Sequence, residues 1–301
     1  MGGVDHHDFC IICAKPEELA QVLRVFEADF QQDFKRAKGK RVFDHVFELG
    51  NGYTLKLTAC TTMGHMHAAV RTAQVILSSH PQIVFFVGTA ASLSPSEIQL
   101  GDVVIPRKAV SRVYEKVSEE GQGDYDARAR DKEFEEFTVE TIKNALISDL
   151  ATKDCSEDGL SAIAALDVGK VTLERGPAGE ITINGQRHAL REPKVHQDID
   201  IFSCGMVVDS ISYREMINRL TRRSMRKTAA IDMESYGFFR AIEAARDMDV
   251  KYNCSGLMIR GISDYAGRKR ETESRPDGWK DKAVRNAAIV TGALMKKLAL
   301  V

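Results

Sequence analysis

The sequence lacks several features that would assign it to a well-defined class. No apolar run among its 301 residues is long enough to span a bilayer, and no signal peptide precedes Phe9. The formal net charge is −1, so the chain lacks the positive excess by which phosphate attraction dominates nucleic-acid binding. We therefore expect a cytoplasmic protein that has neither a membrane nor a nucleic acid as its partner.

Other absences argue against particular cofactors. Cys10-Ile-Ile-Cys13 has CxxC spacing, but it lies inside an apolar strand-like run, so buried thiols are favoured over a redox pair. His65 and His67 have HxH spacing without an evident third ligand, which favours a turn or core role over a metal site. No GxGxxG motif follows Phe9–Ala14, which argues against a dinucleotide oxidoreductase. No cofactor is expected.

What the chain does contain is an alternation of apolar strands with amphipathic helices. Strands are predicted at 9–14, 41–49, 53–60, 83–87, 102–106, 170–173, 180–187, 199–203, 228–232 and 255–262. Helices are predicted at 17–30, 66–79, 133–150, 209–223, 234–247 and 279–298, and a mobile loop at 111–132. This alternation predicts an α/β protein with a mostly parallel or mixed sheet covered on both faces.

Polar residues follow the apolar runs in four places, where a covered sheet binds its ligands. The segments are Ala14-Lys-Pro-Glu-Glu18, Val87-Gly-Thr-Ala-Ala-Ser92, Asp232-Met-Glu-Ser235 and Ser263-Asp-Tyr-Ala266. Two acids at one sheet edge, Glu234 and Asp264, can share a substrate, one binding hydroxyls and one handling a proton. Each residue also has a plainer interpretation. Glu18 and Glu234 suit a first helical turn, and Asp264 suits a turn or N-cap.

Together, and in this order, the four segments and Leu100-Gly-Asp-Val-Val104 resemble the nucleoside phosphorylase/nucleosidase superfamily. That group contains purine nucleoside phosphorylase and methylthioadenosine/S-adenosylhomocysteine nucleosidase. The resemblance implies a three-layer α/β/α fold with a central twisted mixed sheet. It also implies one domain over 9–301 with a variable insertion at about 111–195, after a disordered start at 1–8. Tyr236, Tyr265 and Trp279 look most similar to the branch found in fungal and bacterial signalling or immunity proteins.

The resemblance also implies roles for individual residues. Asp264, oriented by Ser263, resembles the acid that faces the purine N7, where a proton is needed because adenine leaves poorly as an anion. Glu234 resembles the carboxylate that binds the ribose hydroxyls, and Met233 would pack under the ribose. A homodimer or higher homo-oligomer is implied as well.

The remaining binding residues follow from the same resemblance. Thr89, with its neighbour Ala90, would offer a hydroxyl and nearby N–H groups to the nucleophile or ribose, unless it is only a turn hydroxyl. Val207 and Val208 match the segment that lies along the base, although family members often carry an aromatic residue there.

The resemblance also bears on the choice between hydrolysis and phosphorolysis. Phosphorylases of the superfamily hold phosphate with arginines, but this chain has Glu18 at the first such position and Phe86 at the second. Glu18 resembles the acid that activates water in the nucleosidases, so hydrolysis is favoured. Phosphorolysis stays open because Lys15 or Arg71 could supply a cation.

The substrate is expected to be a small purine nucleoside or nucleotide, cleaved to adenine and a ribose or ribose phosphate. Arg268-Lys-Arg270 and the basic run from Arg219 to Lys227 either clamp a 5′-phosphate or form a solvated charged face. A non-catalytic nucleoside sensor is the remaining alternative. Retention of three acids argues against it, since a binder needs neither a base nor a proton donor.

Overall fold

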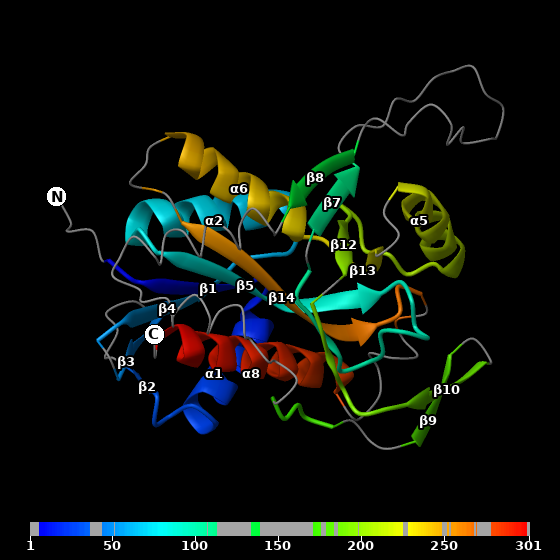
Figure 1. Cartoon of the computed structure of the whole chain (residues 1–301), viewed down its shortest axis with the longest axis horizontal. Helices are drawn as coiled ribbons and strands as arrows, with labels where there is room; N and C mark the ends of the chain where they lie inside the picture. Colours follow the sequence, from blue (N-terminus) through cyan, green and yellow to red (C-terminus); the bar gives the residue numbers. More distant parts are fainter. Residues whose placement is uncertain are drawn as a thin grey trace.

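The computed structural model describes residues 6–36, 44–50, 52–106, 108–112, 134–138, 171–175, 179–183, 186–197, 199–224, 228–248, 252, 254–267, 269 and 278–299. Helices cover both faces of one mixed sheet (Figure 1). On one face lie α2 (His65–Ser79) and α6 (Ser235–Met248), and on the other lie α1 (Pro16–Ala28) and α8 (Trp279–Ala299). The predicted three-layer α/β/α architecture is therefore confirmed.

The centre of the sheet consists of buried parallel strands. β1 (Phe9–Cys13) lies between β4 (Thr54–Ala59) and β5 (Ile83–Ser92) and is parallel to both. β5 is in turn parallel to β14 (Ser255–Asp264) along nearly its whole length. Every residue of β1 is buried, as expected for an apolar strand covered on both faces.

The other described elements extend this centre on both sides. They are β2 (Phe34–Arg36), β3 (His45–Leu49), β6 (Val103–Val104), β7 (Lys108–Arg112), β8 (Phe134–Thr138), β9 (Gly179–Ile183), β10 (Gln186–Leu190), β11 (Val195–His196), β12 (Asp200–Ser203), α5 (Ile211–Ser224) and β13 (Thr228–Asp232). The strand order is β2-β3-β4-β1-β5-β13-β12-β7-β8; β14 also pairs with β6, and β6 with β11. β9 and β10 form a separate hairpin, as the sequence predicts.

β5 differs from its prediction at its carboxyl end. The segment Val87–Ser92 was expected to turn after Val87, but the strand continues to Ser92. The extra residues stay extended because Gly88 to Ala91 pair with β14, and Ala91 and Ser92 pair with β13, which runs antiparallel. Tertiary pairing therefore overrides the turn preference of Gly88-Thr89.

Two further predictions are wrong in the described part of the predicted insertion. Phe134–Thr138 falls in the predicted helix 133–150 but forms β8, because it pairs antiparallel with β7 at the sheet edge. Residues 139–150 of that helix, and the predicted loop from 113 onward, lie outside the described residues. Residues 171–173 form no strand, and next to them Glu174 N–H donates to Asn286 Oδ1 of α8 at 2.7 Å.

The ordered part of the chain begins before Phe9, because His7 and Asp8 form hydrogen bonds with neighbouring segments. His7 is buried and its N–H donates to Ser79 O at 3.0 Å, while the Asp8 carboxylate accepts from Thr54 and Gln82. The prediction of a disordered segment over residues 1–8 therefore fails for these two residues. Residues 1–5 lie outside the described part.

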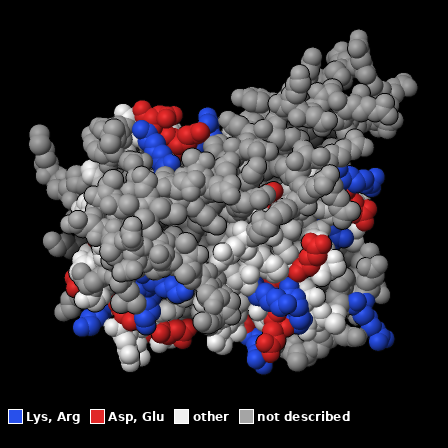
Figure 2. Space-filling view, in the orientation of Figure 1, with Lys and Arg blue, Asp and Glu red and all other residues white. Residues whose placement is uncertain are grey.

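On the face in Figure 2, described acidic and basic side chains are interspersed and do not gather by sign. No helix in the described ranges combines the length and the apolar character needed to cross a bilayer.

Candidate active site

The carboxyl ends of β1, β5, β13 and β14 meet around a pocket of about 220 Å³. Nine of the ten predicted site residues line it, namely Glu18, Thr89, Ala90, Val207, Val208, Met233, Glu234, Ser263 and Asp264. The tenth, Arg268, lies outside the described residues. Residues as far apart in the sequence as Glu18 and Asp264 are brought together because parallel strands deliver their carboxyl ends to one edge.

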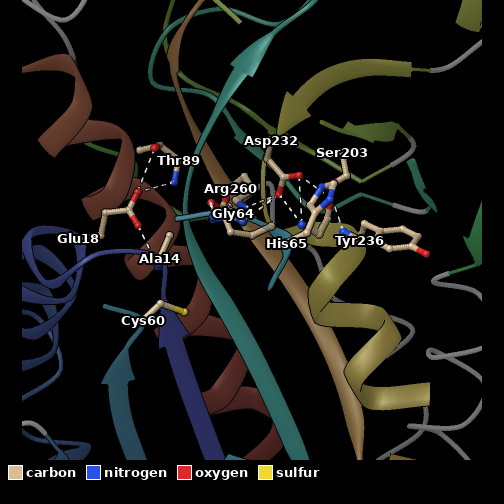
Figure 3. Close-up of polar contacts among 12 residues, drawn as sticks. Ala14, Glu18, Cys60, Gly64, His65, Thr89, Ser203, Asp232, Tyr236 and Arg260 are labelled. Atoms are coloured by element: carbon tan, nitrogen blue, oxygen red, sulfur yellow. Dashed lines mark hydrogen bonds and ion pairs between the residues drawn. The ribbon is translucent and has the colours of Figure 1, made fainter. Parts of the chain in front are cut away.

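Glu18 is held in place by donors on both of its oxygens (Figure 3). It lies in the first turn of α1 and is only 4 % exposed. Its Oε2 accepts from Ala14 N–H at 3.1 Å, and its Oε1 accepts from the N–H and hydroxyl of Thr89 at 3.2 and 3.0 Å. The bond to Ala14 serves the helix start, but the two bonds to Thr89 direct the carboxylate toward β5 and the pocket.

Arg260 is a functional candidate that the sequence reasoning missed. It lies in β14, is fully buried, and stacks on the Phe86 ring at 4.8 Å. Its Nε and Nη2 donate to Asp232 Oδ2 at 3.1 and 2.9 Å, and Nη2 also donates to Glu234 Oε2 at 3.1 Å. Its Nη1 has no hydrogen-bond partner in the described structure, although it is buried.

The unpartnered Nη1 of Arg260 and Oε2 of Glu18 lie close to each other over Gly88. A Cβ placed on Gly88 would stand 2.6 Å from that nitrogen and 2.9 Å from that oxygen. Gly88 is the register partner of Arg260 in the parallel β5–β14 pair, so a side chain here would occupy the space that the guanidinium uses. The buried Nη1 of Arg260 therefore lies near the Glu18 carboxylate, behind the pocket wall that Glu18 and Thr89 line.

Glu234 faces the pocket and not its own helix. Its Oε1 accepts from Gly64 N–H at 3.0 Å, at the start of α2, and its Oε2 accepts from Arg260. Burial raises the pKa of Glu234 to about 7, against the lowering effect of Arg260, because one guanidinium serves several carboxylates. Helix capping falls to Asp232, which accepts from Ser235 N–H and Oγ–H. The first-turn interpretation therefore does not account for Glu234.

Asp264 combines its plainer role with a place in the pocket. Its Oδ1 accepts from Ala266 N–H at 2.9 Å, which stabilises a turn in which Ala266 has a φ of 52°. Its Oδ2 accepts from the Ser263 hydroxyl at 2.9 Å and lies 3.7 Å from Lys269 Nζ. Asp264 is 2 % exposed and lines the same pocket as Glu18.

The sequence of this chain matches the family model of the phosphorylase superfamily over residues 8–296. The chain belongs to the phosphorylase superfamily. No curated protein matches it.

Solved structures support the fold of this superfamily member. Futalosine hydrolase of Helicobacter pylori is 17 % identical, covers 98 % of this chain and 99 % of its own, and has a TM-score of 0.57. The 5′-methylthioadenosine/S-adenosylhomocysteine nucleosidase of Neisseria meningitidis is 18 % identical, and the alignment covers 96 % of this chain and 98 % of the nucleosidase, also with a TM-score of 0.57. The nucleosidase of Colwellia psychrerythraea, solved with adenine, is 15 % identical, and the alignment covers 98 % of this chain and 97 % of the nucleosidase, with a TM-score of 0.58.

For a phosphorylase-superfamily member, the two cations left open by the sequence differ in position. Arg71 points away from the pocket, donating to Ala59 O at 2.9 Å and Thr58 Oγ1 at 2.7 Å. Lys15 lines the pocket beside Glu18. Phe86 is buried under Arg260, so the strand before Gly88 carries no cation of its own.

The histidine and cysteine motifs play no visible part in the pocket. His65 Nε2 lies 2.9 Å from Ser203 Oγ, its ring packs on Tyr236, and no described cluster of His, Cys, Asp or Glu could hold a metal ion. Cys10 and Cys13 are free thiols, and burial raises the pKa of both well above the usual value. The two cysteines are buried thiols as expected, whereas His65 is half-buried and His67 is exposed in the first turn of α2.

Proposed function

We propose that this protein hydrolyses the N-glycosidic bond of a purine nucleoside or nucleotide and releases adenine. The observation that carries the proposal is the pair formed over Gly88 by the anchored Glu18 carboxylate and the unpartnered Nη1 of Arg260. A water molecule in the pocket beside Glu18 has a general base within reach, and the buried charge of Arg260 lies near that base.

Each proposed step uses a residue of the pocket. Water adds to C1′ of the ribose while Glu18 takes its proton, and the electron pair of the breaking glycosidic bond goes to the purine. Asp264, oriented by Ser263, supplies or shares the proton that the purine N7 takes. Glu234 accepts hydrogen bonds from the ribose hydroxyls and stabilises the positive charge that develops on the sugar.

The remaining lining residues have supporting roles in the proposal. Met233 packs under the ribose and Ala90 borders it, while Thr89 holds Glu18 in place. Val207 and Val208 lie along the base. Val207 is half exposed and aliphatic, so base binding depends more on hydrogen bonding than on stacking. Adenine as the base is supported by the adenine bound to the Colwellia nucleosidase.

Adenine release from adenosine, followed by chromatography, tests the proposal. Glu18→Gln removes the base but keeps the shape, so kcat should fall by about 10²- to 10⁴-fold. Glu17→Gln is the matched control, since Glu17 is the exposed neighbour in the same helical turn. Equal activities of the two variants would refute the role of Glu18, and release from none of the purine substrates would favour a binding protein.

We also propose that the protein forms a homodimer or a larger homo-oligomer. The support is a row of exposed apolar side chains on α2, formed by Met66, Val70 and Leu77. These residues lie on one side of a helix that begins at the pocket edge, where Gly64 contacts Glu234. A molar mass from light scattering equal to one chain would contradict it.

A further inference from the structure

Two lysines of the pocket have no counter-charge in the described structure. Lys15 and Lys280 both line the pocket and are half-buried, and the side-chain ammonium of neither has an ion pair or hydrogen bond with any described residue. The third lysine of the lining, Lys269, differs because its Nζ lies 3.7 Å from Asp264. A partly desolvated ammonium without a partner is a charge that an anionic ligand can neutralise.

The two lysines belong to helices that run in parallel. Arg285 of α8 donates to Gln21 of α1 at 3.1 Å, and further toward the C-terminus Lys296 of α8 pairs at 2.9 Å with Asp33, which follows α1. The contacts advance in the same order along both segments, so α1 and α8 point the same way. Both helices therefore begin at the same side of the pocket, the side on which Glu18 lies.

Lys15 and Lys280 lie at similar distances along their helices from the contact between Gln21 and Arg285. Counted along the helix axes, they precede Gln21 and Arg285 by about 9 Å and about 7.5 Å, at 1.5 Å per residue. Lys15 is the N-cap residue of α1, and Lys280 is the second residue of α8. Two lysines thus flank two helix N-termini, whose unpaired N–H groups and dipoles also favour an anion.

The acidic residues nearby do not neutralise this corner. Glu17 and Asp281, in the first turns of the same helices, are exposed to solvent and do not line the pocket. Glu18 does line it, but its carboxylate is held by Ala14 and Thr89 and forms no ion pair with either lysine in the described structure. The positive corner, formed by Lys15, Lys280 and the two helix N-termini, is therefore available to a ligand.

We propose that the positive corner binds a phosphate group carried by the substrate, so that the preferred substrate is a nucleoside phosphate. The proposal rests on the proposed function and names its substrate class. The phosphate is the substrate's own because the proposed nucleophile, activated by Glu18, is water and not phosphate. These lysines, and not Arg268 or Arg270, are the groups that the described structure places at the pocket.

Comparison of adenosine with AMP in phosphate-free buffer tests the substrate class. Adenine release is measured for the wild type and for Lys15→Gln, Lys280→Gln and the double variant. Each substitution should lower kcat/KM for AMP by about 10- to 100-fold more than for adenosine, as expected for losing a charge-assisted hydrogen bond. Lys282→Gln is the control, because Lys282 packs over the Trp279 ring and does not line the pocket; its AMP-to-adenosine ratio should equal that of the wild type.

The outcomes separate this inference from the proposed function. Equal losses of kcat/KM for AMP and adenosine, or no preference for AMP in the wild type, would refute phosphate binding by the positive corner. The proposal of nucleoside hydrolysis would be unaffected. Turnover that requires added inorganic phosphate, with KM for phosphate raised in the lysine variants, would overturn both. If no substrate is cleaved, calorimetry with AMP and adenosine decides. Tighter binding of AMP that is lost in the double variant supports the corner, and equal binding refutes it.

Discussion

Gly88 is the position at which one added methyl group would disturb the proposed nucleophile site without altering any polar residue. In Gly88→Ala the new Cβ would stand 2.6 Å from Arg260 Nη1 and 2.9 Å from Glu18 Oε2. Because ordinary contacts begin at 3.4 Å, these atoms must move by about 0.8 Å and about 0.5 Å. The φ of Gly88 lies outside the left-handed region, so the backbone itself accepts alanine.

The displaced groups cannot move freely. The Arg260 guanidinium is held by Asp232 and Glu234, and the Glu18 carboxylate by Thr89 and Ala14. Misplacement of catalytic groups by about 1 Å costs roughly 10²-fold in rate, so we expect kcat/KM to fall about 100-fold. The free energy of unfolding should fall by only about 1–3 kcal/mol, the usual cost of overpacking.

The assay is adenine release together with urea unfolding of the same preparations. Gly50→Ala is the matched control, because a Cβ there meets nothing within 4 Å. Activity of Gly88→Ala within about threefold of that control would refute the idea that Glu18 and Arg260 act together over Gly88. Loss of activity accompanied by global unfolding would contradict the prediction that the added methyl group acts mainly on the Glu18 and Arg260 side chains.

Two further predictions concern pH. Burial raises the pKa of Glu234 from 4.5 to about 7. Between these two pH values the folded protein retains a proton that the unfolded chain loses. The free energy of unfolding should therefore fall by up to about 3 kcal/mol as pH rises from 4.5 to about 7. Glu234→Gln should flatten that slope in denaturant titrations, and an unchanged slope would count against a raised pKa. Burial acts to raise the pKa of Asp102, but hydrogen bonds from His196, Arg191 and backbone N–H groups outweigh it and lower the pKa below 3.8. Asp102→Asn should therefore cost about 2–4 kcal/mol at pH 7, a loss that shrinks below pH 4; a loss that persists there would contradict the ionised form.

The residues at strand ends were predictable because strand order dictates where they meet. Glu18, Glu234 and Asp264 each follow or end an apolar run, and parallel strands bring such positions to one edge. Their contacts were less predictable. Glu234 suits a helix start in sequence, yet its side chain reaches Gly64 and Arg260 from other segments.

Arg260 escaped prediction because it lies inside an apolar run that forms a strand. The signal was nonetheless present: a charged residue in such a run must be paired when it is buried, since an unpaired buried charge is very costly. Asp232, at the end of β13, was the available partner. Similarly, β8 was missed because its pairing with β7 is a tertiary contact that helical periodicity in Phe134–Thr138 does not report.

The most direct test of hydrolysis by this pocket is adenine release with and without inorganic phosphate, with the sugar product identified in each case. The assignment of Glu18 and Arg260 to a water molecule predicts the same rate in phosphate-free and phosphate-containing buffer, with a sugar that carries no phosphate at C1. Strict dependence on phosphate, with a sugar 1-phosphate as product, would contradict it.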